Sequence, residues 1–154
     1  MTRAPESAEA AARPRESGEA VLCNCQAIRQ AARQVTQLYD RHLAPAGLRT
    51  TQFSLLARLE RAGPLAINEL AARMVMDRTT MGRALRPLQR EGLVAIDPGR
   101  DARTRALRLT PAGKRRLAKA VPLWRQAQDA FEASFGSTEA ARLRATLARV
   151  VTAA

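Results

Sequence analysis

The stretch that decides the fold is residues 65–110, LAINELAARMVMDRTTMGRALRPLQREGLVAIDPGRDARTRALRLT. Asp77 divides it, because its carboxylate can accept hydrogen bonds from the unpaired amides of a following first helical turn. Before Asp77, apolar residues recur at the three-and-four spacing of one helix face, namely at Ile67, Leu70, Ala71 and Met74. Two short helices in this order are typical of a helix-turn-helix.

The second of these helices has one apolar face and one basic face. The same spacing predicts that four apolar side chains pack inward, namely Met81, Ala84, Leu85 and Leu88. No acidic residue interrupts the basic face between Arg78 and Arg90. Guanidinium groups and hydroxyls at a helix N-terminus suit phosphates and guanine edges in the major groove. We therefore expect DNA contacts from Arg78, Thr79, Thr80, Arg83 and Arg86. The alternative is a basic surface helix without a partner.

A β-hairpin is predicted directly after this helix. Gly92 favours the helix end, residues 93–96 read as a first strand, and residues 105–109 read as a return strand. Alternation in the return strand buries Leu107 and Leu109. The pattern therefore predicts a two-stranded ribbon, or wing, beside the basic helix.

The residues between the two strands, DPGRD at 97–101, are typical of a turn. Such a tip projects Arg100 and Arg103, and arginine is attracted by the negative potential of a narrow A·T minor groove. Asp101 can hold one of these arginines in a carboxylate–guanidinium pair, or it can be a plain turn residue. The wing is thus a second candidate DNA contact.

Two prolines fall inside predicted helices. Pro87 removes a hydrogen bond to the carbonyl of Arg83, so we expect a kink there and restrict base contacts to residues 78–86. Pro122 predicts a similar bend in the helix that follows the wing.

Long apolar stripes flank this central region. Residues 1–18 lack any apolar period and are predicted to be disordered, whereas residues 19–47 predict one long helix. Its stripe consists of Val21, Cys25, Ile28, Ala32, Val35, Tyr39 and His42. A further helix starts at Thr50 or Thr51 and turns inward Phe53, Leu55, Leu56 and Leu59.

Two more helices are expected within residues 111–154, separated by Gly136. Their stripes comprise Leu117, Val121, Trp124, Phe131 and Phe135, then Leu143, Leu147, Val150 and Val151. An unpaired apolar seam of this length would be a sticky surface, so we expect a homodimer. We assign residues 19–47 and 111–154 to dimerisation and 48–110 to DNA binding; the alternative is that the terminal helices fold back on their own domain.

Charge agrees with a polyanionic partner. The chain carries a formal net charge of +12, and residues 68–116 hold twelve basic and five acidic residues. Charge alone would also suit a nonspecific nucleoid-type nucleic-acid-binding protein, which is the alternative function. No glycine-rich phosphate loop, paired carboxylates or Ser/His/Asp set indicates an enzyme, and no cofactor is expected. With no long apolar run and no signal-like segment, we expect no membrane association and a cytoplasmic location.

The run DRTTMGRALRPLQREGLVAIDPGRDARTRALRLTPAG, residues 77–113, resembles the recognition helix, wing and following helix start of the MarR family of bacterial transcriptional regulators. More weakly, the likeness extends from about Cys23 to the C-terminus. The resemblance implies a mainly α fold, a winged helix-turn-helix with a small β-hairpin wing, and N- and C-terminal helices that form a dimerisation region. It also implies binding to a pseudo-palindromic operator, usually by a repressor that a small molecule or oxidation releases.

Cys25 and Tyr39 are fourteen positions apart. This spacing is similar to that of the organic-hydroperoxide-sensing branch of the family, in which tyrosines hydrogen-bond to the sensor thiolate; the second tyrosine of that branch falls at Thr50 here. The resemblance thus implies a redox sensor at Cys25, and the alternative is a small buried hydrophobe. Cys23 and Cys25, two apart on a helix, would point to nearly opposite sides and could not easily pair with each other.

The resemblance also implies an effector cleft between the dimer helices and the winged domain. Aromatic or phenolic acids are common effectors in the family, and His42 and Arg49 are the candidate lining residues. No metal site is expected, because His42 is the only histidine and no acidic residue lies at a ligand spacing from it.

Overall fold

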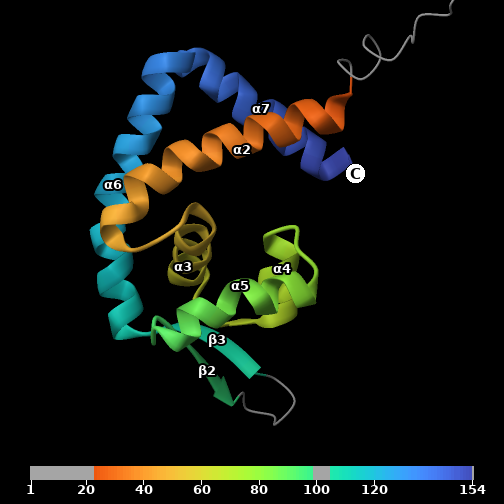
Figure 1. The fold of residues 1–154 in the computed structure, drawn as a ribbon. Coiled ribbons are helices and arrows are strands. Elements are labelled where there is room, and N and C mark those ends of the chain that lie inside the picture. Colours follow the sequence, from red (N-terminus) through yellow and green to blue (C-terminus); the bar gives the residue numbers. More distant parts are fainter. Residues whose placement is uncertain (1–22, 99–104, 154) are drawn as a thin grey trace, which may run out of the picture. The chain divides into compact units, whose positions relative to one another are not determined.

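The computed structural model describes residues 23–98 and 105–153. Of these, the residues up to Gln34 form one unit, and those from Val35 onward form a second that contains the site below. The elements, shown in Figure 1, follow one another as α2 (Asn24–Leu43), the short 3₁₀ helix η2 (Ala44–Ala46), α3 (Thr50–Ala62), β1 (Leu65–Ala66), α4 (Ile67–Arg73), α5 (Arg78–Arg90), β2 (Val94–Pro98), β3 (Arg105–Leu109), α6 (Pro111–Phe135) and α7 (Ser137–Ala153). The predicted mainly α winged helix-turn-helix is confirmed.

The three strands form one antiparallel sheet in the order β1-β3-β2. Leu107 of the central strand β3 faces Leu65 of β1 on one side and Ile96 of β2 on the other. β3 has the bounds that the sequence predicts. β1 has no signal in the sequence, because two residues are too few to show alternation and its partner lies far along the chain.

The first strand of the hairpin differs from the prediction. β2 runs from Val94 to Pro98, so the assignment of Asp97 and Pro98 to the turn is wrong. The Asp97 carboxylate accepts from Arg108 Nε of the neighbouring strand, which holds this part of the ladder together. Proline is tolerated as the last residue of the strand, opposite Arg105, where the ladder ends.

Leucine fills most of the core of the winged domain. The inward faces predicted for α3 and α5 are largely confirmed: all the predicted side chains are buried except Ala84, which is half-buried. The largest fully buried side chains are Leu43, Leu55, Leu56, Leu59, Leu70, Met81, Leu85, Leu88 and Leu107. No polar or charged residue among those described is buried. Apolar burial therefore orients these helices.

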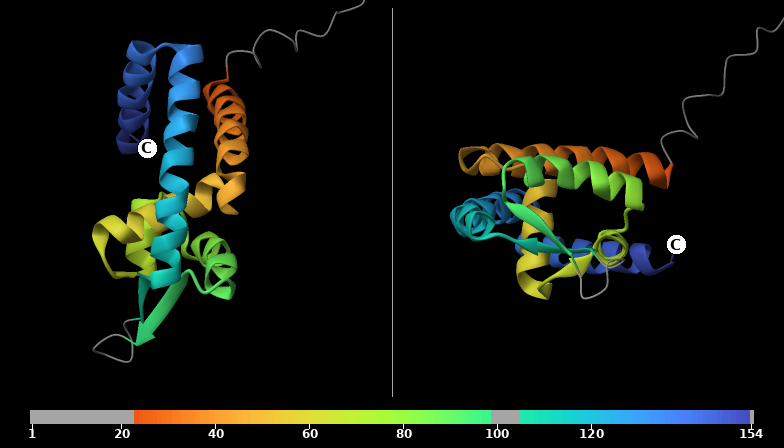
Figure 2. Two further views of the ribbon diagram at one scale, coloured as in Figure 1. Left: turned by 90° about the vertical axis from the view of Figure 1, so that its left-hand side faces the viewer. Right: turned by 90° about the horizontal axis from the view of Figure 1, so that it is seen from below.

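The C-terminal helices leave the winged domain and then reverse. Figure 2 shows α6 running away from β3, with α7 turning back beside its far end. Neither Pro87 nor Pro122 ends its helix, since α5 continues to Arg90 and α6 to Phe135. The predicted α7 stripe is exposed in the single chain at Leu147 (40%), Val150 (44%) and Val151 (58%).

Helices α4 and α5 each end in a turn with the same hydrogen-bond pattern. After α5, Gly92 N–H donates to Gln89 O and Leu93 N–H donates to Leu88 O, with Gly92 at φ 68°. This is a Schellman motif, in which the left-handed position is normally glycine. The same two bonds close α4, from the amides that follow its last turn to Ala72 O and Ala71 O.

At the end of α4, however, the left-handed position is occupied by Val75, at φ 53°. A β-branched residue is a genuine outlier there, because its side chain crowds the backbone. Val75 is also 72% exposed, so packing does not compensate for the strain. The turn of the helix-turn-helix therefore forms although valine is unfavourable at its left-handed position.

We expect Val75→Gly to stabilise the protein by about 1 kcal/mol, the relief of left-handed strain less the extra backbone entropy of glycine in the unfolded chain. Urea denaturation followed by circular dichroism measures this change. Val75→Ala is the control, because it shortens the side chain but keeps the Cβ. Equal unfolding free energies for the glycine and alanine variants would contradict the strain argument.

Candidate nucleic-acid interface

Asp77 sets the start of α5. Its Oδ1 accepts from the backbone amide of Thr80 at 2.9 Å, and the Thr80 hydroxyl donates to Oδ2. These bonds, the side-chain bond first, hold the pKa of Asp77 below its ordinary value of 3.8. The predicted N-cap is confirmed. The Thr80 hydroxyl, predicted to contact DNA, is here part of the cap.

The outward face of α5 is cationic and open. Arg78, Thr79, Arg83 and Arg86 are all exposed. Within residues 23–98 and 105–153, no carboxylate lies within 4.0 Å of the guanidinium groups of these three arginines.

Some arginines elsewhere on the surface are paired with carboxylates. Ion pairs join Arg73 to Glu69 at 2.7 Å, Arg116 to Glu91 at 3.3 Å, Arg142 to Glu139 at 2.8 Å and Arg144 to Glu132 at 3.0 Å. With respect to the described residues, the guanidiniums of Arg78, Arg83 and Arg86 are therefore free to donate to an external anion or base edge.

The hairpin contributes a further arginine. Arg105, the first residue of β3, is exposed, and nothing in the sequence distinguishes it from Arg108 of the same strand. Arg108 of the same strand pairs instead with Asp97, so it is occupied within the sheet. The predicted wing-tip residues Arg100, Asp101 and Arg103 lie outside the described residues.

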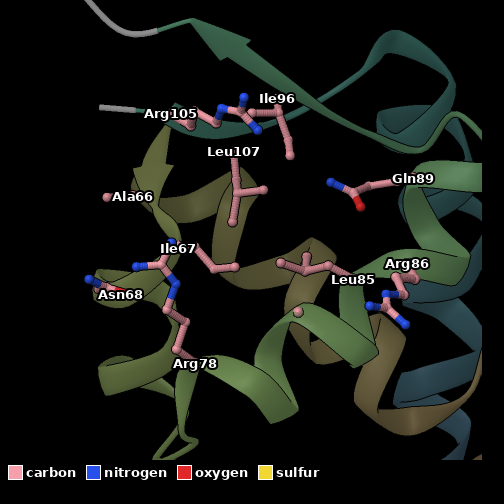
Figure 3. Close-up of a pocket in the computed structure, with 11 residues that line it drawn as sticks. Ala66, Ile67, Asn68, Arg78, Leu85, Arg86, Gln89, Ile96, Arg105 and Leu107 are labelled. Carbon is pink, nitrogen blue, oxygen red and sulfur yellow. The ribbon is translucent and has the colours of Figure 1, made fainter. Parts of the chain in front are cut away.

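A hollow of about 420 Å³ is lined by residues of α4, α5 and the strands. Figure 3 shows side chains from α4, α5 and the strands converging on it. Its apolar lining consists of Ala66, Ile67, Leu85, Ile96 and Leu107, and its polar rim of Asn68, Arg78, Arg86, Gln89 and Arg105. Asn68, Gln89 and Arg105 are candidate site residues without a sequence signal, because only the packing of α4, α5 and β3 brings them together.

The predicted effector residues are only partly arranged as a site. Arg49 Nη1 lies 3.6 Å from Asp40 Oδ2, and Asp40 Oδ1 also accepts from the amide and hydroxyl of Thr50 at 2.6 and 2.7 Å. Asp40 thus ties the end of α2 to the first residue of α3. His42 is half-buried on α2.

A second hollow, of about 380 Å³, is lined by Phe53, Ser54, Ala57, Arg58, Arg61, Met74 and Trp124. The Phe53 and Trp124 rings stack with centroids 5.8 Å apart. Neither His42 nor Arg49 lines this hollow. Stacked rings beside two arginines suit a flat anion.

The predicted redox residues are placed differently from the expectation. Cys25 is exposed, which contradicts the buried-hydrophobe alternative for the single chain. Cys23 precedes α2, and its carbonyl accepts from the amide of Ala27 at 3.0 Å, as an N-cap does. Cys23 and Cys25 are both free thiols.

Tyr39, the expected hydrogen-bond partner of the thiol, is engaged elsewhere. Its hydroxyl donates to Gln128 Oε1 of α6. Burial raises the pKa of Tyr39, the Glu132 carboxylate raises it further, and Arg144 opposes both. Positions fourteen residues apart on a helix are separated by about 21 Å along its axis, so Cys25 and Tyr39 of one chain do not pair.

No helix in the described parts of the chain is long and apolar enough to cross a membrane.

Comparisons with known proteins all point to transcriptional regulators. The sequence profile of the MarR family matches residues 48–99. The crystal structure of the M. tuberculosis transcriptional regulator MosR in complex with DNA is 44% identical, with a TM-score of 0.74 over 85% of this chain and 97% of that chain. The transcriptional repressor CouR bound to a 23-mer DNA duplex is 26% identical, with a TM-score of 0.78 over 87% and 96% of the two chains.

Among curated relatives, an HTH-type transcriptional regulator of Bacillus cereus is 31% identical over 102 residues. The matched region covers 66% of this chain and 65% of that relative.

The Asp77 cap predicts a specific pH dependence of stability. Because the folded pKa is lowered, the stabilisation is present above pH 3.8 and is lost as pH falls through the folded pKa. We expect Asp77→Ala to lower Tm at pH 7, and the difference from the wild type to shrink below about pH 4. Circular dichroism melts between pH 7 and 2 measure this. Asp77→Ser is the control, since it caps without a charge; a pH-independent difference between the wild type and Asp77→Ala would contradict the assignment.

Proposed function

The chain belongs to the MarR family, and from this premise we propose that it is a sequence-specific double-stranded DNA-binding transcriptional regulator that acts as a repressor. The observation that carries the proposal is the set of exposed α5 arginines without a carboxylate partner in the described residues. The repressor CouR and the regulator MosR, both solved on DNA, support it.

The proposed contacts divide between the two grooves. The N-terminal half of α5 enters the major groove, where Arg83 and Arg86 donate to guanine edges and Arg78 and Thr79 donate to phosphates. Thr80 contributes through the cap that orders this turn. Arg100 and Arg103 enter the adjacent minor groove, with Asp101 holding one of them.

We further propose a homodimer that binds a pseudo-palindromic operator. The exposed apolar side chains of Phe135, Leu147, Val150 and Val151 support this, because a partner would remove them from water. Two α5 helices related by a two-fold axis can occupy successive major grooves about 34 Å apart. In this proposal the dimerisation segments are residues 19–47 and 111–154, and residues 48–110 bind DNA. The predicted tail, residues 1–18, lies outside the described residues.

We also propose that this regulator acts in the cytoplasm and has no enzymatic activity. Its input is thiol oxidation at Cys25 or a small aromatic or phenolic effector. Exposure of the Cys25 thiol supports the first. The hollow beside Phe53, Arg58 and Trp124 supports the second and is a better candidate than His42 and Arg49 alone.

We expect Arg83→Ala to weaken operator binding by about 1–3 kcal/mol, roughly 5- to 150-fold in Kd, and to relax sequence preference. Arg90→Ala removes the same charge from the same helix, outside the proposed base contacts of residues 78–86, and is the matched control. Fluorescence anisotropy with an operator selected from random duplexes, and with its scrambled counterpart, measures both effects at several salt concentrations. Equal wild-type affinity for the two duplexes would favour the nonspecific nucleoid-type alternative.

A second prediction concerns the input. Organic hydroperoxide should convert the Cys25 thiol to a sulfenic acid, while the peroxide is reduced to its alcohol, and release the operator. Wild type, Cys25→Ser and Cys23→Ser are compared by gel shift before and after treatment. We expect Cys25→Ser to stay bound. A wild type that also stays bound, but that phenolic acids release, would replace the redox input with the effector.

A further inference from the structure

Gly82 lies inside α5, where glycine lowers helix stability relative to alanine. The other glycines of the described residues have local reasons for their identity. Four adopt positive φ, namely Gly47, Gly63, Gly92 and Gly136. In Gly113 an added Cβ would overlap the backbone oxygen of Leu93.

Neither reason applies to Gly82. It has no positive φ, and an added Cβ there would meet no neighbouring atom within 4 Å. The fold would therefore accept alanine at position 82 and gain helix stability from it. Glycine at this position needs an explanation outside the folded chain.

The space beside Gly82 has a definite chemical character. Gly82 lines the hollow of about 420 Å³ between α5 and the sheet, and also an adjoining hollow of about 400 Å³ along the outer face of α5. Ile67, Arg78 and Arg86 line both. In Figure 3, Leu85 and Leu107 lie between Arg78, Arg86 and Arg105, so apolar side chains are bordered by guanidiniums.

The proposed docking indicates which part of the DNA would occupy this space. If α5 enters the major groove and the hairpin enters the adjacent minor groove, the sugar–phosphate strand that separates the two grooves must pass between them. Deoxyribose is largely apolar on its C–H faces, and its phosphates are anions. This strand matches apolar side chains bordered by arginines.

We propose that Gly82 is a DNA-positioning residue, whose missing side chain lets one strand of the operator seat between α5 and the hairpin, with its phosphates held by Arg78 and Arg105. This inference rests on the proposed function. A side chain at position 82 occupies the space of the strand and holds α5 out of the major groove. The other residues of α5 then lose their base contacts as well.

The test is a size series at position 82, with stability and binding measured on the same full-length proteins. We expect Gly82→Ala to raise Tm by about 2–4 °C and to weaken operator binding at least 5-fold. Gly82→Leu should keep a Tm no lower than the wild type, because leucine covers Ile67 and Ile96, and should weaken binding at least 100-fold. Gly113→Ala is the contrasting control and should lower Tm.

The outcomes separate this inference from the function it rests on. A wild type without operator preference overturns the proposed function itself. A wild type that prefers its operator, with Gly82→Ala and Gly82→Leu binding equally well, overturns only the role of Gly82. A lower Tm for Gly82→Ala also overturns that role, because the fold would then require the glycine.

Discussion

Burial of Met81, Leu85 and Leu88 fixes the direction in which α5 faces. All three side chains are at most 1% exposed, and they pack into a core shared with α3 and the sheet. Each fully buried side chain of this size contributes about 1.5–3 kcal/mol, so rotating the helix about its axis would be costly. The arginine face is turned outward as the necessary opposite of that stripe.

Charge pairing also affects the surface around α5. Most acidic residues of the second unit already have a role: Asp77 caps α5, Asp97 pairs with Arg108, and Glu91 pairs with Arg116. Exposed pairs of this kind contribute little stability, commonly below about 1 kcal/mol. Their larger effect is on surface potential, because carboxylates are occupied away from the outer face of α5. A polyanion therefore meets that face with few competing acids among the described residues.

Two positions in the helix-turn-helix have residue types that local stability would not choose. Val75 occupies a left-handed position suited to glycine, and Gly82 occupies a helix interior suited to alanine. Natural sequences tend to break local rules where function imposes another requirement. For Gly82 the proposed requirement is space for a DNA strand in the hollow that the arginines border. For Val75 the structure shows strain and exposure but no contact that explains them.

The sequence by itself determined the inward faces of α3 and α5, the Asp77 cap and the return strand 105–109, because these depend on periodicity and on neighbours within one turn. It also indicated the family, through the local order of helix, hairpin and helix start. It could not determine β1, the extension of β2 to Pro98, the Tyr39–Gln128 bond or the hollow that joins Arg78, Arg86 and Arg105. Those features join residues far apart in the chain, so only the packing of the helices against the sheet decides them.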